Sequence, residues 1–222
     1  MQKVSPDSLP GAEQSLAGIP GYWREASNFL ARSDPVMAGL VERYGGTPLQ
    51  SRGDPFSTLA RSIVGQQISV KAADSVWRRI LGALPQLDPQ SVLLAGTPGL
   101  QGCGLSVRKV EYLLDLACHF ADGQVNLAGW GGMSNSEIIA ELTAIRGIGV
   151  WTAEMLLIFG LLRPDVFPLD DIGLQKAVAR HYCLGERPSR AALMAAGESW
   201  RPWRSVATWY LWRSLDPIPV EY

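Results

Sequence analysis

Apolar side chains recur at three- and four-residue steps along most of the chain, as they do on the buried face of an α-helix. The first 18 residues lack this periodicity, and we expect them to form a loosely held leader. Helical patterns then begin near Tyr22 and recur in separate segments, at about residues 35–44, 55–64, 69–84, 106–120 and 134–144. The pattern therefore predicts a helical protein.

Start and stop signals support these segments. Asp54-Pro55 places an N-cap residue before a proline at the first helical position. Ser134 and Glu137 have the spacing of a capping box, and Gly45-Gly46 is a typical helix end. The predicted helix at residues 69–84 is expected to point five side chains toward the core: Val70, Ala73, Trp77, Ile80 and Leu81.

Strand patterns are weak, because no segment alternates cleanly between apolar and polar residues over six positions. The helices also recur without the fixed period of a solenoid. The predicted fold class is therefore all-α, a compact bundle of about ten helices joined by short loops.

Composition narrows the class of protein. The chain has 222 residues, of which 47% are hydrophobic and 18% are charged, as in ordinary soluble globular proteins. It has no run of 18 apolar residues, and its first residues lack the apolar core of a signal peptide, so we expect a cytoplasmic protein with no membrane partner. The net charge is −1, so any positive field that binds nucleic acid must be local.

The three cysteines, Cys103, Cys118 and Cys183, are far apart in the sequence. They form neither a CxxC pair nor a four-cysteine cluster. We therefore expect no disulfide framework, no zinc site and no iron–sulfur cluster.

Residues 142–153 predict a hairpin between two helices. Gly147 and Gly149 flank one aliphatic residue, Ile148, and permit a tight turn with bare backbone N–H groups. These groups lie at a helix N-terminus, where unpaired donors and the helix dipole favour an anion such as a phosphate. A plain turn with a glycine C-cap is the alternative. The helix that follows is expected to bury Val150, Ala153, Leu156 and Leu157.

Two adjacent carboxylates, Asp170 and Asp171, follow a proline-containing strap over residues 163–168. They open a further predicted helix, whose N-terminus favours negative charge. Either residue could be an ordinary N-cap, and these positions alone do not separate a cap from a catalytic group.

The string Ile-Arg-Gly-Ile-Gly-Val-Trp-Thr-Ala at residues 145–153 resembles the helix–hairpin–helix of DNA-binding proteins. Together with the strap and Asp170-Asp171, it makes the chain similar to the helix–hairpin–helix (HhH-GPD) DNA glycosylase superfamily from about Asp54 to Leu215. Within it, residues 63–70, the hairpin and residues 201–205 most resemble 3-methyladenine DNA glycosylase II.

The resemblance implies a monofunctional DNA glycosylase that flips alkylated bases, of the 3-methyladenine and 7-methylguanine type, out of damaged double-stranded DNA and leaves an abasic site. Asp171 matches the catalytic aspartate, and Asp170 is expected to cap the helix or support the loop. Gln67 matches the wedge that fills the gap left by the flipped base, with Gln66 beside it in the same turn.

The resemblance also assigns the hairpin. Gly147, Gly149 and Thr152 match positions that hold DNA phosphates. No cofactor is expected to be required, although a structural Na⁺ or K⁺ could bind there to three main-chain carbonyls, those of Thr143, Ile145 and Ile148. Seven basic residues could supply a local positive face: Arg61, Lys71, Arg108, Lys109, Arg146, Lys176 and Arg204.

Trp151 stands where strand-cleaving members carry a lysine, so no Schiff-base nucleophile is expected there. Trp151 and Trp203 are expected to hold the cationic base by their electron-rich faces, with Met155 lining the same pocket. Five other tryptophans are expected in the core: Trp23, Trp77, Trp200, Trp209 and Trp212.

We expect one glycosylase domain over residues 19–222, with a DNA-binding cleft between two lobes. One lobe covers about residues 50–170, and the other combines residues 19–49 with 171–222. The protein is expected to be a monomer that acts at the bacterial nucleoid. Two alternatives remain, a non-catalytic helix–hairpin–helix DNA-binding module and a glycosylase for other base lesions.

Overall fold

The computed structural model describes residues 18–185 and 187–215, and within those ranges it contains helices and no strand. The expected leader lies outside the described residues except for Gly18. The elements are α1 (Trp23–Ser33), α2 (Pro35–Tyr44), α3 (Pro55–Gly65), α4 (Val70–Ala83), α5 (Pro89–Gly102), α6 (Val107–Ala121), α7 (Asn135–Thr143), α8 (Val150–Met155), α9 (Ile172–His181), α10 (Arg190–Glu198) and α11 (Arg204–Leu215), with a 3₁₀ turn (Trp130–Gly132) and a π turn (Leu156–Gly160). The all-α prediction is confirmed.

Side-chain caps start most of these helices as their sequences predict. The Asp54 carboxylate accepts the N–H of Ser57 at 2.8 Å at the start of α3. At α7 the Ser134 hydroxyl accepts the N–H of Glu137, and the Glu137 carboxylate accepts the N–H of Ser134. These contacts confirm the predicted N-cap and capping box.

Helix α5 was not predicted from the sequence. Asp88 and Pro89 provide a proper start, with the Asp88 carboxylate accepting the N–H of Ser91 at 2.7 Å. Gly96, at a φ of +57°, and Pro98 then break the helical pattern inside the element. The apolar periodicity is lost there, and with it the sequence signature of the helix.

Two side chains predicted to be buried are exposed. Leu81 in α4 is 42% exposed, because the buried face of this helix runs through Val76, Trp77 and Ile80 and leaves Leu81 at its edge. Val150 is 50% exposed, because it is the first residue of α8 and precedes the turns that pack. Ala153 and the two leucines after it, Leu156 and Leu157, are buried as predicted.

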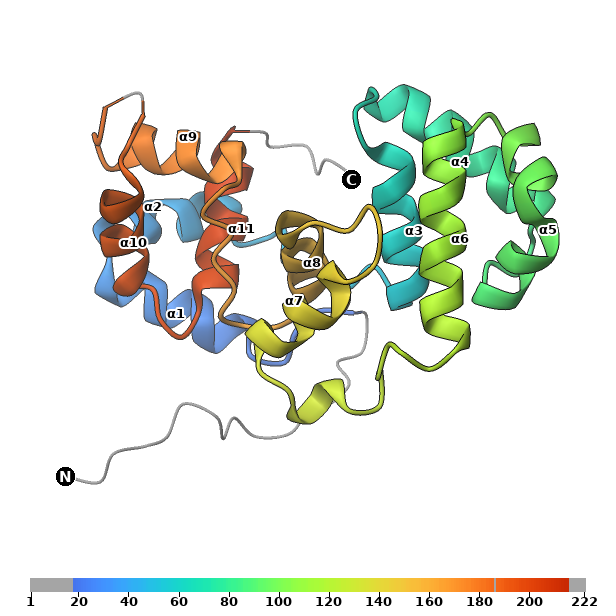
Figure 1. Cartoon of the computed structure of the whole chain (residues 1–222). Helices are drawn as coiled ribbons and strands as arrows, with labels where there is room; N and C mark the ends of the chain where they lie inside the picture. The colour runs from blue at the N-terminus through green and yellow to red at the C-terminus, as the bar shows by residue number, and fades with distance from the viewer. Residues whose placement is uncertain (1–17, 186, 216–222) are drawn as a thin grey trace.

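The helices form two lobes with the hairpin between them (Figure 1). Helices α3, α4, α5 and α6 pack together in one lobe, and α1, α2, α9, α10 and α11 pack together in the other. Helices α7 and α8 lie between the lobes, and the π turn after α8 packs on α3. The central position of α8 places its residues next to both lobes.

A buried aspartate organises the lobe that contains both ends of the described chain. Asp34 caps α2 with one carboxylate oxygen, and its other oxygen accepts the Tyr182 hydroxyl at 2.6 Å and the Trp200 indole N–H at 3.0 Å. Burial and the neighbouring carboxylate raise the pKa of Tyr182, which keeps this hydroxyl a donor. No described helix is long and apolar enough to cross a membrane.

Candidate active site

Asp171 is the N-cap of α9 and also the most elaborately held carboxylate near the hairpin. Its Oδ1 accepts the N–H of Leu174 at 2.6 Å and the indole N–H of Trp212 at 2.8 Å. Its Oδ2 accepts the indole N–H of Trp151 at 2.9 Å. Three donors from three helices therefore fix the orientation of one carboxylate before any substrate arrives.

The neighbouring Asp170 does not cap the helix, so this part of the prediction was wrong. Its side chain is exposed and forms an ion pair with Arg190 at 2.7 Å. The helix begins at Ile172, so the residue whose side chain can reach the first N–H groups of α9 is Asp171. Asp171 therefore both caps α9 and accepts the indole N–H groups of Trp151 and Trp212.

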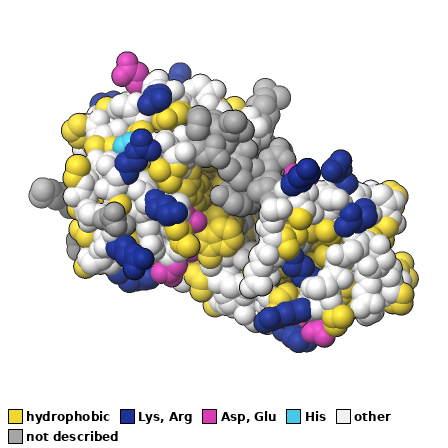
Figure 2. All heavy atoms as spheres, turned by 90° about the horizontal axis from the view of Figure 1, so that it is seen from above, with side chains coloured by type: hydrophobic (Ala, Val, Ile, Leu, Met, Phe, Trp, Pro, Cys, Tyr) yellow, Lys and Arg dark blue, Asp and Glu magenta, His cyan; other side chains and the backbone are white. Residues whose placement is uncertain are grey.

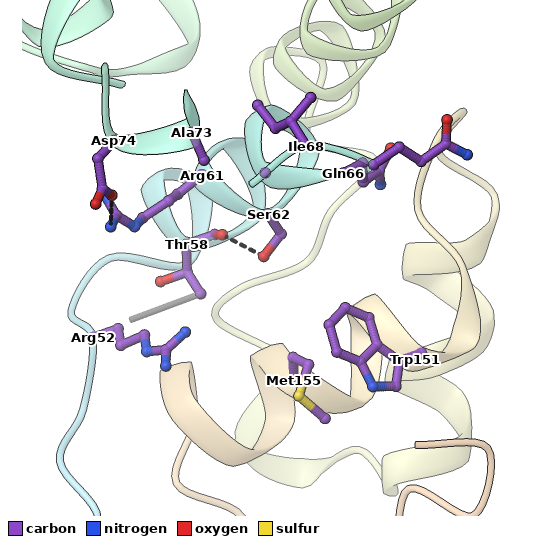
Figure 3. Close-up of a pocket in the computed structure, with 12 residues that line it drawn as sticks. Arg52, Thr58, Arg61, Ser62, Gln66, Ile68, Ala73, Asp74, Trp151 and Met155 are labelled. Atoms are coloured by element: carbon purple, nitrogen blue, oxygen red, sulfur yellow. Dashed lines mark hydrogen bonds and ion pairs between the residues drawn. The ribbon is translucent and has the colours of Figure 1, made fainter. Parts of the chain in front are cut away.

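Trp151 and Met155 face a cavity of about 410 Å³ between α8 on one side and α3 with the start of α4 on the other (Figure 3). This volume lies within the roughly 300–1,000 Å³ range of small-molecule sites. Trp151 is 36% exposed, so part of its indole surface is open to a ligand. Asp171 is not among the described residues that line the cavity, but its carboxylate accepts the N–H of the Trp151 indole, which forms part of the cavity wall.

Trp203 is not part of this cavity. It is only 5% exposed and stacks on Tyr22, with ring centroids 5.4 Å apart. The predicted place of Trp203 in the base pocket is corrected on this geometry, because its ring faces are covered by the core. Trp212, which was expected in the core, packs against the core by stacking on Phe159 and also donates its indole N–H to Asp171. Its position in the sequence gave no indication of this, because Trp209 and Trp212 share one apolar helix.

The turn after α3 carries the predicted wedge. Gln67 is exposed and has a φ of +58°, an uncommon backbone conformation for a side chain other than glycine. The Gln66 amide instead donates a hydrogen bond to the Gly147 carbonyl at 2.8 Å, so Gln66 joins this turn to the hairpin rather than projecting from it. Ile68, the next residue after Gln67, is 41% exposed and also lines the cavity, which the sequence did not predict.

The hairpin geometry requires its first glycine. Gly147 has a φ of +88°, and a Cβ added there would lie 2.3 Å from the ring of Tyr112. Gly149, the N-cap of α8, has open space around its Cα and no side-chain cap within the described chain. Ile148 is 5% exposed and fills the space below the turn, as predicted. Thr152 is buried, so its side chain is not a surface ligand, and its backbone N–H belongs to the first turn of α8.

The predicted cation ligands lie in the same hairpin. The carbonyls of Thr143, Ile145 and Ile148 come from one turn, and that of Ile145 also accepts the N–H of Ile148 at 3.1 Å. Main-chain carbonyl oxygens are the ligands that alkali cations take in proteins.

Basic side chains lie on both lobes on the face in Figure 2, around a hollow with hydrophobic side chains at its floor. Five of the seven predicted basic residues have partners within the protein. Arg61 pairs with Asp74, Arg146 pairs with Glu111, and Arg108 donates to the Tyr112 hydroxyl. Arg204 forms an ion pair with Asp165, and the Lys109 ammonium donates to the Val64 carbonyl at 2.6 Å. Burial lowers the pKa of Lys109. A chain of net charge −1 thus gathers Lys and Arg side chains on both lobes of one face.

Glu154 is a third acid near this site that the sequence did not single out. It is half-buried on α8, one turn after Trp151. Burial raises its pKa to about 7, with further increases from the negative charges of Asp170 and Asp171 and a decrease from Arg190. Near neutral pH this side chain therefore changes between its acid and its carboxylate.

An all-helical fold of two lobes, a glycine hairpin between them and a helix-capping aspartate beside a cavity define a class of base excision repair protein. A family model described as "HhH-GPD superfamily base excision DNA repair protein" matches residues 60–202, and the chain belongs to this family.

Relatives and solved structures agree with this assignment. The chain is 34% identical over 192 residues to the putative DNA-3-methyladenine glycosylase YfjP of Bacillus subtilis, covering 83% of this chain and 67% of that protein. It is 30% identical over 213 residues to DNA-3-methyladenine glycosylase 1 of Schizosaccharomyces pombe, covering 93% and 88%. The structure of the S. pombe 3-methyladenine DNA glycosylase Mag1 in complex with abasic DNA superposes with a TM-score of 0.74 at 30% identity, covering 86% of this chain and 96% of that one.

Proposed function

We propose that the protein is a DNA glycosylase that excises alkylated bases of the 3-methyladenine and 7-methylguanine type and leaves an abasic site for base excision repair. The observation that carries the proposal is the carboxylate of Asp171, held by two indole N–H groups beside a cavity with an exposed indole wall. The relatives named above support the substrate class.

The reaction breaks the bond between the base nitrogen and C1′ of the sugar, and both bonding electrons leave with the base. The sugar becomes cationic, and a water molecule then adds to C1′ and loses a proton. A fixed carboxylate beside this developing cation stabilises it without having to reorganise. Asp171 supplies that charge and is the acceptor to which the water can pass its proton.

The cavity suits a cationic leaving base. A base must leave the duplex to be attacked, and the space between α3 and α8 receives it. Alkylation at N3 or N7 puts positive charge on a purine, and the face of Trp151 attracts such a ring by roughly 0.5–2 kcal/mol. Met155 closes the pocket with a polarisable apolar side chain.

The enzyme stops at the abasic site. Trp151 has no amine with which to attack the sugar, and no lysine is among the described residues that line the cavity. Without an amine nucleophile the Schiff base that precedes strand cleavage cannot form there. Borohydride should therefore trap no covalent complex between the protein and damaged DNA, and the strand should stay intact until base or heat is added.

The hairpin and the wedge hold the duplex. The N–H groups at Gly149 and the first turn of α8 bind a backbone phosphate, and Gly147 shapes the turn that presents them. Gln67 enters the base stack, where its amide can pair with the orphaned base. A Na⁺ or K⁺ bound to the carbonyls of Thr143, Ile145 and Ile148 would offset phosphate charge. A monomer is sufficient for this activity, because both lobes that form the site belong to one chain.

Duplex DNA treated with a methylating agent tests the proposal, with released bases separated and quantified. Wild-type protein is expected to release 3-methyladenine or 7-methylguanine. Asp171→Asn keeps a good N-cap but removes the charge, and it should lose at least about a hundredfold in rate, the size of one electrostatic group at a developing charge. The matched control Asp170→Asn, which removes only an exposed ion pair, should keep most of the activity.

Salt-sensitive duplex binding without release of any methylated base would contradict the proposal and favour a non-catalytic DNA-binding module. Equal losses of base release in Asp171→Asn and Asp170→Asn would show that Asp171 is not the catalytic carboxylate.

A further inference from the structure

One face of α6 contacts both turns that the proposed function assigns to DNA binding. Lys109, Tyr112 and Asp115 are spaced three residues apart, so they lie in one inclined row along the helix. All three side chains are partly buried. Helix α6 packs beside α3, whose end leads into the wedge turn, residues 66–68 (Figure 1). No step of the proposed reaction uses this row of side chains.

Lys109 holds the end of α3. Its ammonium donates to the Val64 carbonyl at 2.6 Å, and this carbonyl belongs to the last turn of the helix, where acceptors lack a partner from a following turn. The helix dipole also favours a cation at this end. Gln67 follows three residues later with a φ of +58°, a conformation that persists only where the surroundings hold it. The contact from Lys109 is therefore part of what keeps the wedge turn in its shape.

Asp115 holds the hairpin in a corresponding way. Its Oδ2 accepts the backbone N–H of Arg146 at 2.8 Å, in the turn between α7 and α8. Between the two contacts of the row, the Tyr112 ring lies 2.3 Å from the position that a Cβ on Gly147 would take, so the hairpin has no room to shift toward α6. Three successive positions of the row thus contact the end of α3, the first hairpin glycine and the residue before that glycine.

Charge alone explains neither residue. A carboxylate beside a phosphate site repels the phosphate, so Asp115 weakens DNA binding unless its contact with the Arg146 N–H improves the site in another way. Lys109 has the sign of charge that DNA attracts, but its ammonium is directed at the Val64 carbonyl, and burial lowers its pKa. Both residues are therefore better explained by the turns that they hold than by direct contact with DNA.

We propose that α6 positions the two DNA-contacting turns against each other, with Lys109 as the positioning residue of the wedge and Asp115 as that of the hairpin. The inference rests on the proposed function and adds two residues that act on DNA only through Gln67 and through the N–H groups at the start of α8. Loss of the Lys109 contact impairs the opening of a base pair, and loss of the Asp115 contact impairs phosphate binding. Each loss leaves the other step nearly unchanged.

Two measurements separate the two steps. The first is single-turnover release of 7-methylguanine from a duplex in which it lies opposite cytosine, compared with a duplex in which it lies opposite a tetrahydrofuran abasic analogue and has no base pair to open. The second is the affinity for undamaged duplex DNA at a fixed salt concentration. Arg79→Met on α4 is the matched control for Lys109→Met, because Arg79 donates at 2.7 Å to the carbonyl of Cys103 at the end of α5, in a contact that involves neither turn.

Lys109→Met should lower release opposite cytosine about tenfold, the size of one charge-assisted hydrogen bond, and release opposite the abasic analogue less than about threefold. Its affinity for undamaged duplex should stay close to that of wild type. Lys109→Arg should recover most of the loss, because a guanidinium can donate to the same carbonyl. In a double-mutant cycle, Lys109→Met should add little to the effect of Gln67→Ala. Arg79→Met should change neither measurement.

Asp115→Ala should bind undamaged duplex DNA about threefold to tenfold more weakly, although removal of a negative charge by itself strengthens DNA binding. Asp115→Asn keeps an oxygen that can accept the Arg146 N–H, so it should recover most of the affinity. The ratio of the release rates from the two lesion duplexes should not change in either variant.

Retained release opposite the abasic analogue shows that a variant is folded. Equal losses from both duplexes in Lys109→Met would overturn its role at the wedge, and tighter DNA binding by Asp115→Ala would overturn the role of Asp115 at the hairpin, yet both results would leave the proposed function intact. Release from neither duplex by wild-type protein would contradict the proposed function and with it the wedge role. The affinity of Asp115→Ala would still decide the hairpin role.

Discussion

At the scale of single residues, the site depends on how many donors hold one carboxylate. Asp171 accepts hydrogen bonds from the backbone of its own helix and from indoles on α8 and α11. The two indoles approach different oxygens, so neither oxygen can rotate away without losing a donor. In the proposed reaction, each donor therefore contributes to the alignment of the negative charge with the sugar.

Removing one indole donor should lower activity without unfolding the protein. Trp212→Phe loses the N–H to Asp171 but keeps an aromatic ring on Phe159. We expect base release to fall about tenfold, because a hydrogen bond to a charged group is worth roughly 1.5–3 kcal/mol and part of this is recovered by water. Single-turnover release of 7-methylguanine measures the effect.

Trp209→Phe is the matched control on the same helix, since its N–H donates at 2.9 Å to the Thr47 carbonyl and not to the site. Equal rates for Trp212→Phe and wild type would show that the indole donor does not contribute to catalysis.

The raised pKa of Glu154 predicts a dependence of stability on pH. Burial favours the protonated form, so the folded protein binds this proton more tightly than the unfolded chain. The free energy of unfolding should then decrease as pH rises from about 4.5 to about 7. Glu154→Gln should be more stable than wild type at pH 8 by roughly 1–2 kcal/mol, allowing for solvent screening, and nearly equal to it at pH 4.

Urea unfolding at the two pH values measures this difference. Glu25→Gln, an exposed change on α1, is the control and should show no such pH-dependent gain. A Glu154→Gln variant with the same stability difference from wild type at both pH values would be inconsistent with the raised pKa.

The sequence predicts those site residues that belong to motifs. Asp171, Trp151 and Met155 could be placed near one another because a hairpin and a capped helix fix their local geometry. Trp212 and Arg52, which lines the cavity, could not, because each reaches the site only through tertiary packing. Glu154 lies on the same helix as Trp151, but the burial that raises its pKa depends on tertiary packing. Trp203 was misplaced for the same reason, since whether a tryptophan faces a cavity or Tyr22 depends on elements far away in the sequence.

At the scale of elements, the two glycines of the hairpin have different roles. The backbone conformation at Gly147 requires a glycine for the protein to fold, whereas Gly149 is expected to be needed only for the approach of a DNA phosphate. Gly147→Ala should destabilise the protein by roughly 2–3 kcal/mol or more, because it combines a φ of +88° with a Cβ 2.3 Å from the Tyr112 ring. Urea unfolding tests this.

Gly149→Ala is the contrasting variant. Its φ is −97°, and a Cβ there meets no described atom within 4 Å, so stability should stay within about 0.5 kcal/mol of wild type. Its affinity for duplex DNA should still fall, because the Cβ stands where a phosphate must approach. An unchanged affinity of Gly149→Ala for duplex DNA would show that no phosphate binds close to Gly149.

The sequence predicted where a helix begins when an N-cap residue was followed directly by an apolar stripe. Helices α3 and α7 begin where Asp54 and Ser134 indicate. Helix α5 escaped detection because Gly96 and Pro98 interrupt its pattern. The backbone leaves helical geometry at Gly96, so the interruption in the sequence corresponds to a real kink in the element.

At the scale of the whole molecule, the site is shared between the lobes. Trp151 belongs to α8, whereas Asp171 and Trp212 belong to helices of the lobe that contains α1 and α2. A movement of α9 and α11 relative to α8 would therefore change the distance between the indole wall and the carboxylate. The periodicity of apolar residues predicted the all-α class. It could not predict that the site draws residues from different parts of the molecule, because periodicity does not show which helices contact one another.

The hydrogen bond from Gln66 to the Gly147 carbonyl has a consequence for how such a protein would search a genome. It ties the turn that carries Gln67 to the hairpin, so wedge and phosphate clamp cannot move apart freely. An intact duplex would satisfy the clamp but resist opening, and the protein would soon move on. At a weakened base pair the wedge could enter the base stack while the hairpin binds the phosphate. Because the wedge turn and the hairpin are joined, they would then dissociate from the DNA only together. If Gln67 and the hairpin bind DNA as proposed, this single amide would convert local damage into a longer residence time on the DNA.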